Sequence, residues 1–310
     1  MTFSIVARCA RTGELGVAVS TAVPAVGSMC PYLRAGVGAV STQSWVNPYL
    51  ALDALDRMEQ GDSAEAALES VLRTDAAAGL RQIGIVDREG RSAVWTGLEC
   101  TGWAGHRNGT DYTVQGNMLT GPETVAAMAA AFESSAGTAL DERLMAALEA
   151  GQGAGGDRRG RQSAALRIMR ERAYPMLDLR VDEHVQPVAE LRRVLKVARH
   201  QLVPFVEGMP TRDDPGRAPP PEVTQMLLDS PAMRPGGISD EPHPHTADVL
   251  AQWMGAAFVP ERLAHNLRLY GGIVAEIERI RELDLSDLHP AVIFDPLRSL
   301  GADATGGGNV

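Results

Sequence analysis

The stretch of sequence that decides the fold is a pair of short segments, Thr2-Phe3-Ser4-Ile5-Val6-Ala7-Arg8 and Leu15-Gly16-Val17-Ala18-Val19-Ser20-Thr21. In the first segment Phe3, Ile5 and Ala7 recur at the two-residue period of a β-strand. Thr12-Gly13 supplies turn residues between the two segments. The pattern therefore predicts a tight β-hairpin whose first strand begins at Thr2.

Thr2 carries the first candidate chemistry. Because Thr2 is small, we expect Met1 to be removed, which would leave Thr2 with both a hydroxyl and a free α-amine. A free α-amine has a pKa of roughly 7.7 to 8.0, so near neutral pH part of it can accept the hydroxyl proton. Such a residue can cleave an amide bond. A threonine after methionine also occurs at ordinary surface termini, so this segment alone leaves both interpretations open.

Further segments of the first two hundred residues extend the pattern of the hairpin. They are Gly36-Val37-Gly38-Ala39-Val40-Ser41-Thr42-Gln43, Gln82-Ile83-Gly84-Ile85-Val86-Asp87, Trp103-Ala104-Gly105-His106, Gln115-Gly116-Asn117 and Gly155-Gly156-Asp157-Arg158-Arg159-Gly160-Arg161-Gln162-Ser163-Ala164-Ala165-Leu166. Together they resemble DUF1028, a bacterial family placed among the N-terminal-nucleophile (Ntn) hydrolases. The resemblance covers residues 1–205, and its last segment is the most specific part. It implies a four-layer αββα sandwich and an amide hydrolase that uses Thr2 as its nucleophile.

The order of predicted elements agrees with an α+β fold of this kind. Strands are expected over residues 36–42, 80–87, 91–96, 112–119, 162–170 and 177–181, and helices over 48–58, 63–72, 122–134, 140–150 and 187–203. Strands and helices occur in groups, which fits a sandwich of sheets and helices better than alternating βαβ units.

Three residues near predicted strand ends are candidates to complete a site around Thr2. Amide hydrolysis needs hydrogen-bond donors where the oxyanion develops, and Asn117 and Gln43 are suitable residue types. Asn117 has an alternative role, a left-handed turn conformation after Gly116. Trp45 is expected to shape the wall of the pocket, with ordinary packing as its alternative.

The glycine-framed block contributes the candidate substrate-binding residues Asp157, Arg158, Arg159, Gln162 and Ser163. An arginine of this loop can pair with a substrate carboxylate through two parallel hydrogen bonds, which predicts an acidic substrate. Alternatively, Asp157 and one arginine form an ion pair that holds the loop, and the two roles can coexist.

Composition limits the other possibilities. The chain has 310 residues, 45% of them hydrophobic, and a formal net charge of -10 without a large basic cluster, which argues against nucleic-acid binding. Lys196 is the sole lysine. Arginine cannot act as a general base, so the α-amine of Thr2 would have to accept the proton.

Several classes of cofactor and location are also disfavoured. His106 and His184 lack a second ligand at metal-binding spacing, no glycine-rich phosphate loop follows the first strand, and we therefore expect neither metal nor cofactor. Three cysteines without paired spacing and no long apolar run indicate a cytoplasmic protein with no membrane segment. Cys9 and Cys30 are rival nucleophiles, although such cysteines are usually small buried hydrophobic residues.

The composition changes after about residue 205. We expect a proline-rich linker over 206–245, a helical module with an extended strap over 246–300, and a flexible tail over 301–310. The spacing of Leu263, Leu267, Tyr270, Val274 and Ile277 predicts an apolar stripe on this module, which requires a partner. Its Asp-Leu…Pro-Ala-Val-Ile-Phe-Asp-Pro ending is similar to the small C-type subunits of amidotransferases, which implies an amidase-signature partner. A contact with its own chain or with a second copy in a homo-oligomer is the alternative.

Two functions therefore remain open at this point. In the first, the chain is an amidohydrolase that cleaves a small, acidic amide through Thr2. In the second, it is a catalytically inactive scaffold that recruits an amidase through residues 246–300.

Overall fold

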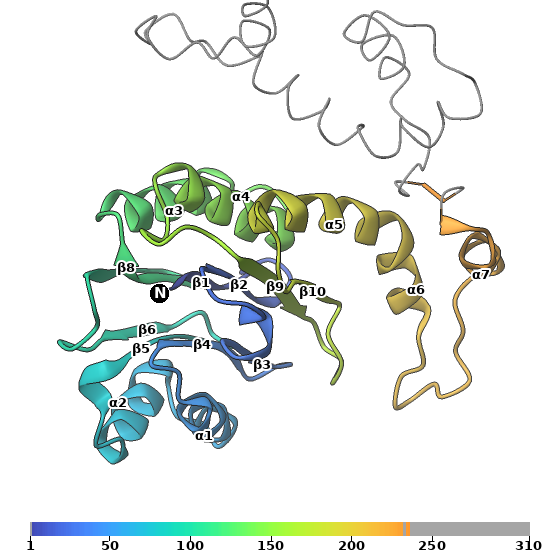
Figure 1. Ribbon diagram of the computed structural model, residues 1–310. Helices are drawn as coiled ribbons and strands as arrows, with labels where there is room; N and C mark the ends of the chain where they lie inside the picture. The colour runs from blue at the N-terminus through green and yellow to red at the C-terminus, as the bar shows by residue number, and fades with distance from the viewer. Residues whose placement is uncertain (1, 232–233, 236–310) are drawn as a thin grey trace, which may run out of the picture. The chain divides into compact units, whose positions relative to one another are not determined.

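The computed structural model describes residues 2–231 and 234–235, which belong to one compact unit that ends at residue 237. Figure 1 shows four layers in this unit. Helices α3 (Glu123–Ser134), α4 (Leu140–Gly153) and α5 (Pro187–Gln201) cover one face of a six-stranded sheet, and a four-stranded sheet lies against its other face. Helices α1 (Pro48–Glu59) and α2 (Ala64–Thr74) cover the outer face of that second sheet. The α+β fold expected from the sequence is confirmed.

The six-stranded sheet is antiparallel and has the strand order β10-β9-β2-β1-β8-β7. Its strands are β1 (Thr2–Arg8), β2 (Leu15–Thr21), β7 (Trp103–Gly109), β8 (Tyr112–Leu119), β9 (Ser163–Met169) and β10 (Leu177–Val181). The helices on its outer face are α3 (Glu123–Ser134), α4 (Leu140–Gly153) and α5 (Pro187–Gln201). The predicted hairpin is present, and its first strand lies in the middle of the sheet.

The four-stranded sheet, also antiparallel, has the order β3-β4-β5-β6. Its strands are β3 (Pro31–Arg34), β4 (Gly38–Ser44), β5 (Arg81–Asp87) and β6 (Ser92–Thr96), and its helices are α1 (Pro48–Glu59) and α2 (Ala64–Thr74). Both helices begin at a side-chain cap, because Asn47 Oδ1 accepts from Tyr49 N and Ser63 Oγ accepts from Ala66 N. Two short 3₁₀ helices, η1 (Val26–Ser28) and η2 (Ala78–Leu80), lie in the connections.

Strand β1 is buried on both faces because it lies between the helices and the second sheet. Phe3, Ile5 and Ala7 pack against the helices. Ser4 and Val6 alternate with them and point toward the second sheet. One part of the layer between the sheets is an apolar cluster of Val6, Leu15, Val17, Ala39 and Val86, which we call the apolar half.

The structure differs from the sequence-based expectations at four elements. No secondary structure was expected for β3 or for β7, and the segment Trp103–Gly109 lacks an alternating apolar pattern. The stretch expected as a linker over 206–245 overlaps the end of α6 (Val203–Gly208) and contains α7 (Pro221–Leu228). Each of these helices has a proline at its N-terminus, where the missing N–H costs nothing.

The compact unit also continues past the boundary expected at residue 205. The expected module over 246–300 and the expected tail over 301–310 lie outside the described residues. Among the residues that the structure describes, no helix is long and apolar enough to span a membrane.

Candidate functional site

Thr2 lies in a row of four polar residues that crosses one end of the six-stranded sheet. In the strand register Thr2 is opposite Asn117 on β8 and Thr21 on β2, and Thr21 is opposite Ser163 on β9. Residues directly opposite each other project from the same face of a sheet, here the face toward the second sheet. Thr2 is 5% exposed and Asn117 2%. The hydroxyl of Thr2 donates to Thr21 Oγ1 over 3.3 Å.

The layer between the sheets is polar next to this row. We call this part the glutamine half, and it consists of Ser4, Gln43, Gln82, Gln115 and Asn117. All five are buried, and their side chains bond to one another. Gln115 Nε2 donates to Ser4 Oγ over 2.7 Å, and Ser4 Oγ donates to Gln43 Oε1 over 2.7 Å. Gly84 makes room for Gln115, because a Cβ at this position would lie 2.4 Å from Gln115 Oε1.

Gln43, expected as a donor to substrate, is a central member of the glutamine half. Its Nε2 donates to Gln82 Oε1 over 2.8 Å and to the backbone oxygen of Thr2 over 3.3 Å. Its side chain therefore holds β1 against the second sheet. The contact to Thr2 gives it an indirect role in placing that residue.

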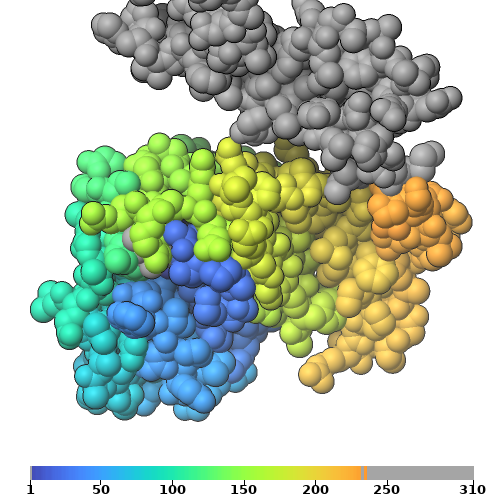
Figure 2. Space-filling view, viewed as in Figure 1, coloured from blue at the N-terminus to red at the C-terminus, as the bar shows by residue number. Residues whose placement is uncertain are grey.

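The glycine-framed block folds onto the end of β1 and β2. Asp157 is buried, and its carboxylate accepts from Ala22 N over 3.1 Å and from Arg159 N over 2.9 Å. Gly155 and Gly156 have φ angles of 112° and 57°, and a Cβ on Gly156 would lie 3.2 Å from the ring of Phe3. Glycine is needed where the loop turns this tightly against β1. In Figure 2 the dark blue atoms of the N-terminal residues lie beside yellow-green atoms.

The remaining residues of the block are of two kinds: most of them bond to neighbouring residues, and one is exposed to solvent. Arg159 forms an ion pair with Asp157 at 3.3 Å, so the expected loop-fixing pair is present. Ser163 Oγ donates to Val23 O over 2.6 Å and accepts from Val26 N, and these bonds hold the loop after β2. The backbone N of Gln162 donates to Thr21 O. Arg158 is exposed and, within the described part of the chain, its guanidinium has no ion-pair partner.

Trp45 lies directly after β4 at the same end of the molecule and is 64% exposed. Its ring is accessible, while its backbone oxygen accepts from Arg81 Nη1 over 2.7 Å. The neighbouring Ser44 has a positive φ of 70°, Met118 next to Asn117 has 51°, and Ala25 before η1 has 55°. Non-glycine residues in this conformation cost of order 1 kcal/mol or more each and cluster at functional sites.

Neither of the two cysteines expected as alternative nucleophiles lies in the row that contains Thr2. Burial raises the pKa of the Cys30 thiol to about 12, so the thiolate is scarce at neutral pH. Burial alone would raise the pKa of Cys9, but hydrogen bonds from Thr12 outweigh it and lower that pKa. Cys9 lies in the hairpin loop, at the other end of β1 from Thr2.

Lys196 and His106 lie outside the row that contains Thr2. Lys196 is exposed on α5. His106 Nδ1 lies 2.9 Å from Thr96 Oγ1 at the edge of the glutamine half, and desolvation lowers the pKa of its imidazole. Within the described ranges, no group of His, Cys, Asp and Glu could hold a metal ion.

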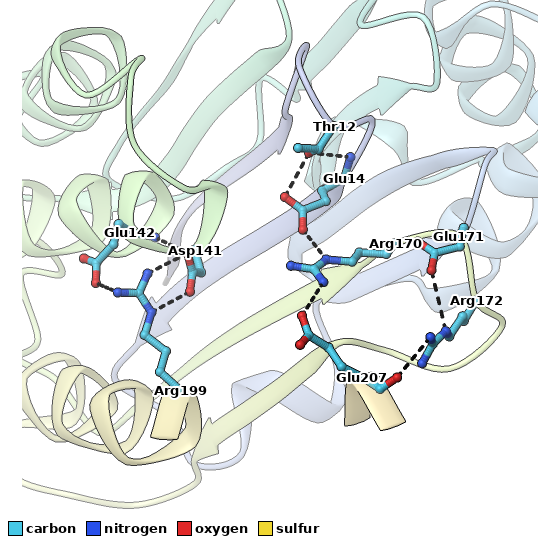
Figure 3. Close-up of polar contacts among 9 residues, drawn as sticks. All are labelled: Thr12, Glu14, Asp141, Glu142, Arg170, Glu171, Arg172, Arg199 and Glu207. Carbon is cyan, nitrogen blue, oxygen red and sulfur yellow. Dashed lines mark hydrogen bonds and ion pairs between the residues drawn. The ribbon is translucent and has the colours of Figure 1, made fainter. Parts of the chain in front are cut away.

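The opposite end of the molecule is held by charged groups. Figure 3 shows Arg170 after β9 pairing with Glu14 of the β1–β2 turn and with Glu207 of α6, the latter at 3.1 Å. Arg172 donates to the backbone oxygen of Glu207 over 3.2 Å. A groove of about 980 Å³ opens there, lined by Leu33, Arg34, Met169, Arg172 and Arg217 among others. This groove is separate from the row that contains Thr2.

Two residues that the sequence did not indicate stand beside Thr2 and Asn117. Thr21 accepts the Thr2 hydroxyl, and Gln82 accepts from Asn117 Nδ2 over 2.9 Å. A signal was available for Gln82, because a glutamine in an otherwise apolar strand needs buried partners. Gln43 and Gln115 have the same signature in β4 and β8.

These features define an α+β protein with four layers, in which a central strand begins with a threonine in a buried polar row. The family model described as "Family of unknown function (DUF1028)" matches residues 2–191, and the chain belongs to this family. The membership expected from the sequence is thus confirmed.

Two solved structures are similar to the chain. The crystal structure of protein SPO2555 from Silicibacter pomeroyi, of the same family, is 28% identical with a TM-score of 0.65, and the match covers 70% of this chain and 98% of that one. Anbu (ancestral beta-subunit) from Yersinia bercovieri is 12% identical with a TM-score of 0.31, over 67% and 98% of the two chains. No curated protein matches the chain.

Proposed function

We propose that the protein is an N-terminal-nucleophile hydrolase that cleaves the C–N bond of a small, acidic amide. The observation that carries the proposal is the position of Thr2, which begins the central strand within a row of buried polar side chains. Removal of Met1 places a free α-amine on the same residue as the hydroxyl. A nucleophile on a rigid, well-packed strand is held in a fixed geometry, which is what such a reaction requires.

The reaction proceeds in two steps. The Thr2 oxygen attacks the amide carbon while the α-amine accepts the hydroxyl proton, and the C–N bond then breaks as this proton passes to the leaving amine. Water next hydrolyses the acyl ester of Thr2, which releases the acid and restores the hydroxyl. Arg158 is exposed and beside this end of the sheet, because its backbone N donates to Met118 O, so it is our candidate for holding a substrate carboxylate.

The setting of the reaction follows from the remaining residues. The α-amine is the base in this scheme, because the chain has a single lysine and it lies on α5. All three cysteines are free, which supports a reducing, cytoplasmic compartment. The segment over 246–300 as a module that binds a second copy or an amidase remains a prediction, since it lies outside the described residues.

The test uses a substituted β-lactone, an electrophile that needs no knowledge of the natural substrate. The Thr2 oxygen attacks the lactone carbonyl, the ring C–O bond breaks, and the released oxygen takes the proton, so the protein gains the mass of one lactone. Intact-protein mass spectrometry should show a full-length chain without Met1 and one adduct on Thr2. Thr2→Ala should reduce the labelling rate at least about 100-fold.

Thr12→Ala is the matched control, because Thr12 is an exposed threonine in the hairpin turn, and it should label like the unaltered protein. Circular dichroism checks that both variants fold. Retention of Met1 in the isolated protein, or equal labelling of Thr2→Ala, would overturn the proposal. Either result would favour the inactive scaffold.

A further inference from the structure

We propose that Gln82 is a positioning residue that orients Asn117, and that Asn117 in turn directs the α-amine of Thr2. The inference rests on the proposed function and assigns a different task to Asn117 from the oxyanion donor expected from the sequence. Three observations carry it: the direction of the Thr2 nitrogen, the hydrogen bonds of Gln82, and the remaining capacity of Asn117.

The backbone nitrogen of Thr2 faces β8. Along β1, Arg8 N donates to Asp111 O beyond the start of β8, whereas Cys9 N donates to Glu14 O on the β2 side. Donors on an antiparallel strand alternate between its two neighbours. The register between β1 and β8 has no interruption, and Thr2 has the same parity as Arg8, so its nitrogen points toward Asn117, its partner in the register.

Gln82 has a single possible orientation of its side-chain amide. Its Nε2 lies 2.8 Å from Gly116 O and 3.2 Å from Gly105 O, and backbone oxygens can only accept. The amide oxygen of Gln82 must then face the other way. There it accepts from Gln43 Nε2 over 2.8 Å and from Asn117 Nδ2 over 2.9 Å. Gln82 is completely buried, so no water can replace these partners without cost.

This orientation determines what Asn117 offers to its neighbours. Because Gln82 requires the NH₂ group of Asn117, the Oδ1 atom of Asn117 is turned away from Gln82. Among the described residues Oδ1 has no hydrogen-bond partner, although Asn117 is only 2% exposed. The side chain that carries this acceptor is on the residue opposite Thr2 in the register, and we infer that Oδ1 is within reach of the α-amine.

Two acceptors on one residue would orient the amine for its role as base. A neutral amine has two N–H groups, and the backbone oxygen and Oδ1 of Asn117 can accept one each. The tetrahedral nitrogen is then left with one lone pair, which is directed away from both acceptors and toward the hydroxyl of Thr2. The same acceptors favour the protonated amine and raise its pKa.

The experiment measures the rate of β-lactone ester formation at Thr2 between about pH 5 and pH 10, by intact mass. The acidic midpoint of this profile reports the pKa of the α-amine. Gln82→Met should lower the plateau rate at least about 10-fold, because the amine is misplaced. It should also move the midpoint to lower pH by about half a unit or more, because Oδ1 is no longer held toward the amine.

Gln115→Met is the matched control, since Gln115 is equally buried between the sheets but does not contact Asn117. Its midpoint should equal that of the unaltered protein. Asn117→Asp is the second variant and decides the matter if Gln82→Met does not fold. A carboxylate beside the amine should move the midpoint to higher pH by about one unit.

The two proposals fail in different ways. If the unaltered protein forms no adduct at Thr2, both the hydrolase and the positioning role are overturned. If it labels normally, but Gln82→Met has the same profile as Gln115→Met or Asn117→Asp leaves the midpoint unchanged, the positioning role alone is overturned.

Discussion

The two halves of the layer between the sheets use opposite means to hold the same pair of sheets together. The apolar half stabilises the contact by removing hydrocarbon from water, which places few constraints on direction. The glutamine half replaces hydrocarbon by amides and hydroxyls, each of which must point at a partner. Apolar packing alone would stabilise the contact between the sheets equally well. The use of directional hydrogen bonds beside Thr2 therefore indicates that the orientation of the side chains matters there.

The largest effect is expected from breaking the glutamine half. Gln43→Ala removes one acceptor and three donor contacts and leaves Ser4 Oγ and the backbone oxygen of Thr2 without this partner. We expect a loss of about 3 kcal/mol in the free energy of unfolding, because buried polar groups are left unsatisfied. Urea titration measures it, with Gln60→Ala at the exposed end of α1 as the control. A loss equal to that of the control would contradict the described network.

An intermediate effect is expected from the apolar half. Val17→Ala removes two buried methyl groups and should cost about 2 kcal/mol of unfolding free energy. The labelling rate of Thr2 should stay the same, since Val17 contacts no member of the polar row. The same protein sample serves for urea titration and for β-lactone labelling. A Val17→Ala protein that folds but labels several-fold more slowly would show that the two halves are not independent.

The smallest effect concerns pH and uses the two ends of β8. Asn117 near one end has an amide side chain that does not titrate, whereas Tyr112 at the other end has a phenol that does. Burial and a hydrogen bond to Glu133 raise the pKa of Tyr112 from 10.0 to about 12. The folded protein then binds this proton more tightly than the unfolded chain. The stability from Tyr112 is therefore complete below pH 10 and is lost as the pH rises through about 12.

We expect this loss to be about 1 kcal/mol, because the carboxylate of Glu133 beside the Tyr112 hydroxyl is half exposed and water screens the repulsion between them. Thermal or urea unfolding between pH 9 and pH 12 measures it, and Tyr112→Phe removes the titrating hydroxyl. The variant should lack that part of the decline. If both proteins lose stability in parallel over this range, the raised pKa of Tyr112 has no part in the folding equilibrium.

Most of the fold was predictable because its strands and helices follow clear periodicities. The hairpin from Thr2 to Thr21, strand β8 and the helices over 48–59 and 187–201 all occur close to where their patterns placed them. Strand β3 is only four residues long, and the edge strand β7 consists mostly of glycine and polar residues, so neither shows a clear period in the sequence. Helix α7 was hidden among prolines that begin it rather than break it.

The site was less accessible to prediction, for a geometric reason. Asn117 was selected by residue type and does pair with Thr2, but the partner that orients it, Gln82, lies on a strand of the other sheet. Alternation along β5 shows that Gln82, Gly84 and Val86 share a face. It does not show which strand that face meets, because the packing of two sheets is decided by the whole chain.

The central position of β1 has a practical consequence. Its first residue is flanked by β2 and β8. A fusion partner placed directly before Thr2 would therefore have to leave the fold between two neighbouring strands and not from an edge strand of the sheet. An affinity tag at that point would also convert the nitrogen of Thr2 into a peptide amide. Preparations purified through such a tag should be compared with material released by a protease that cuts directly before Thr2.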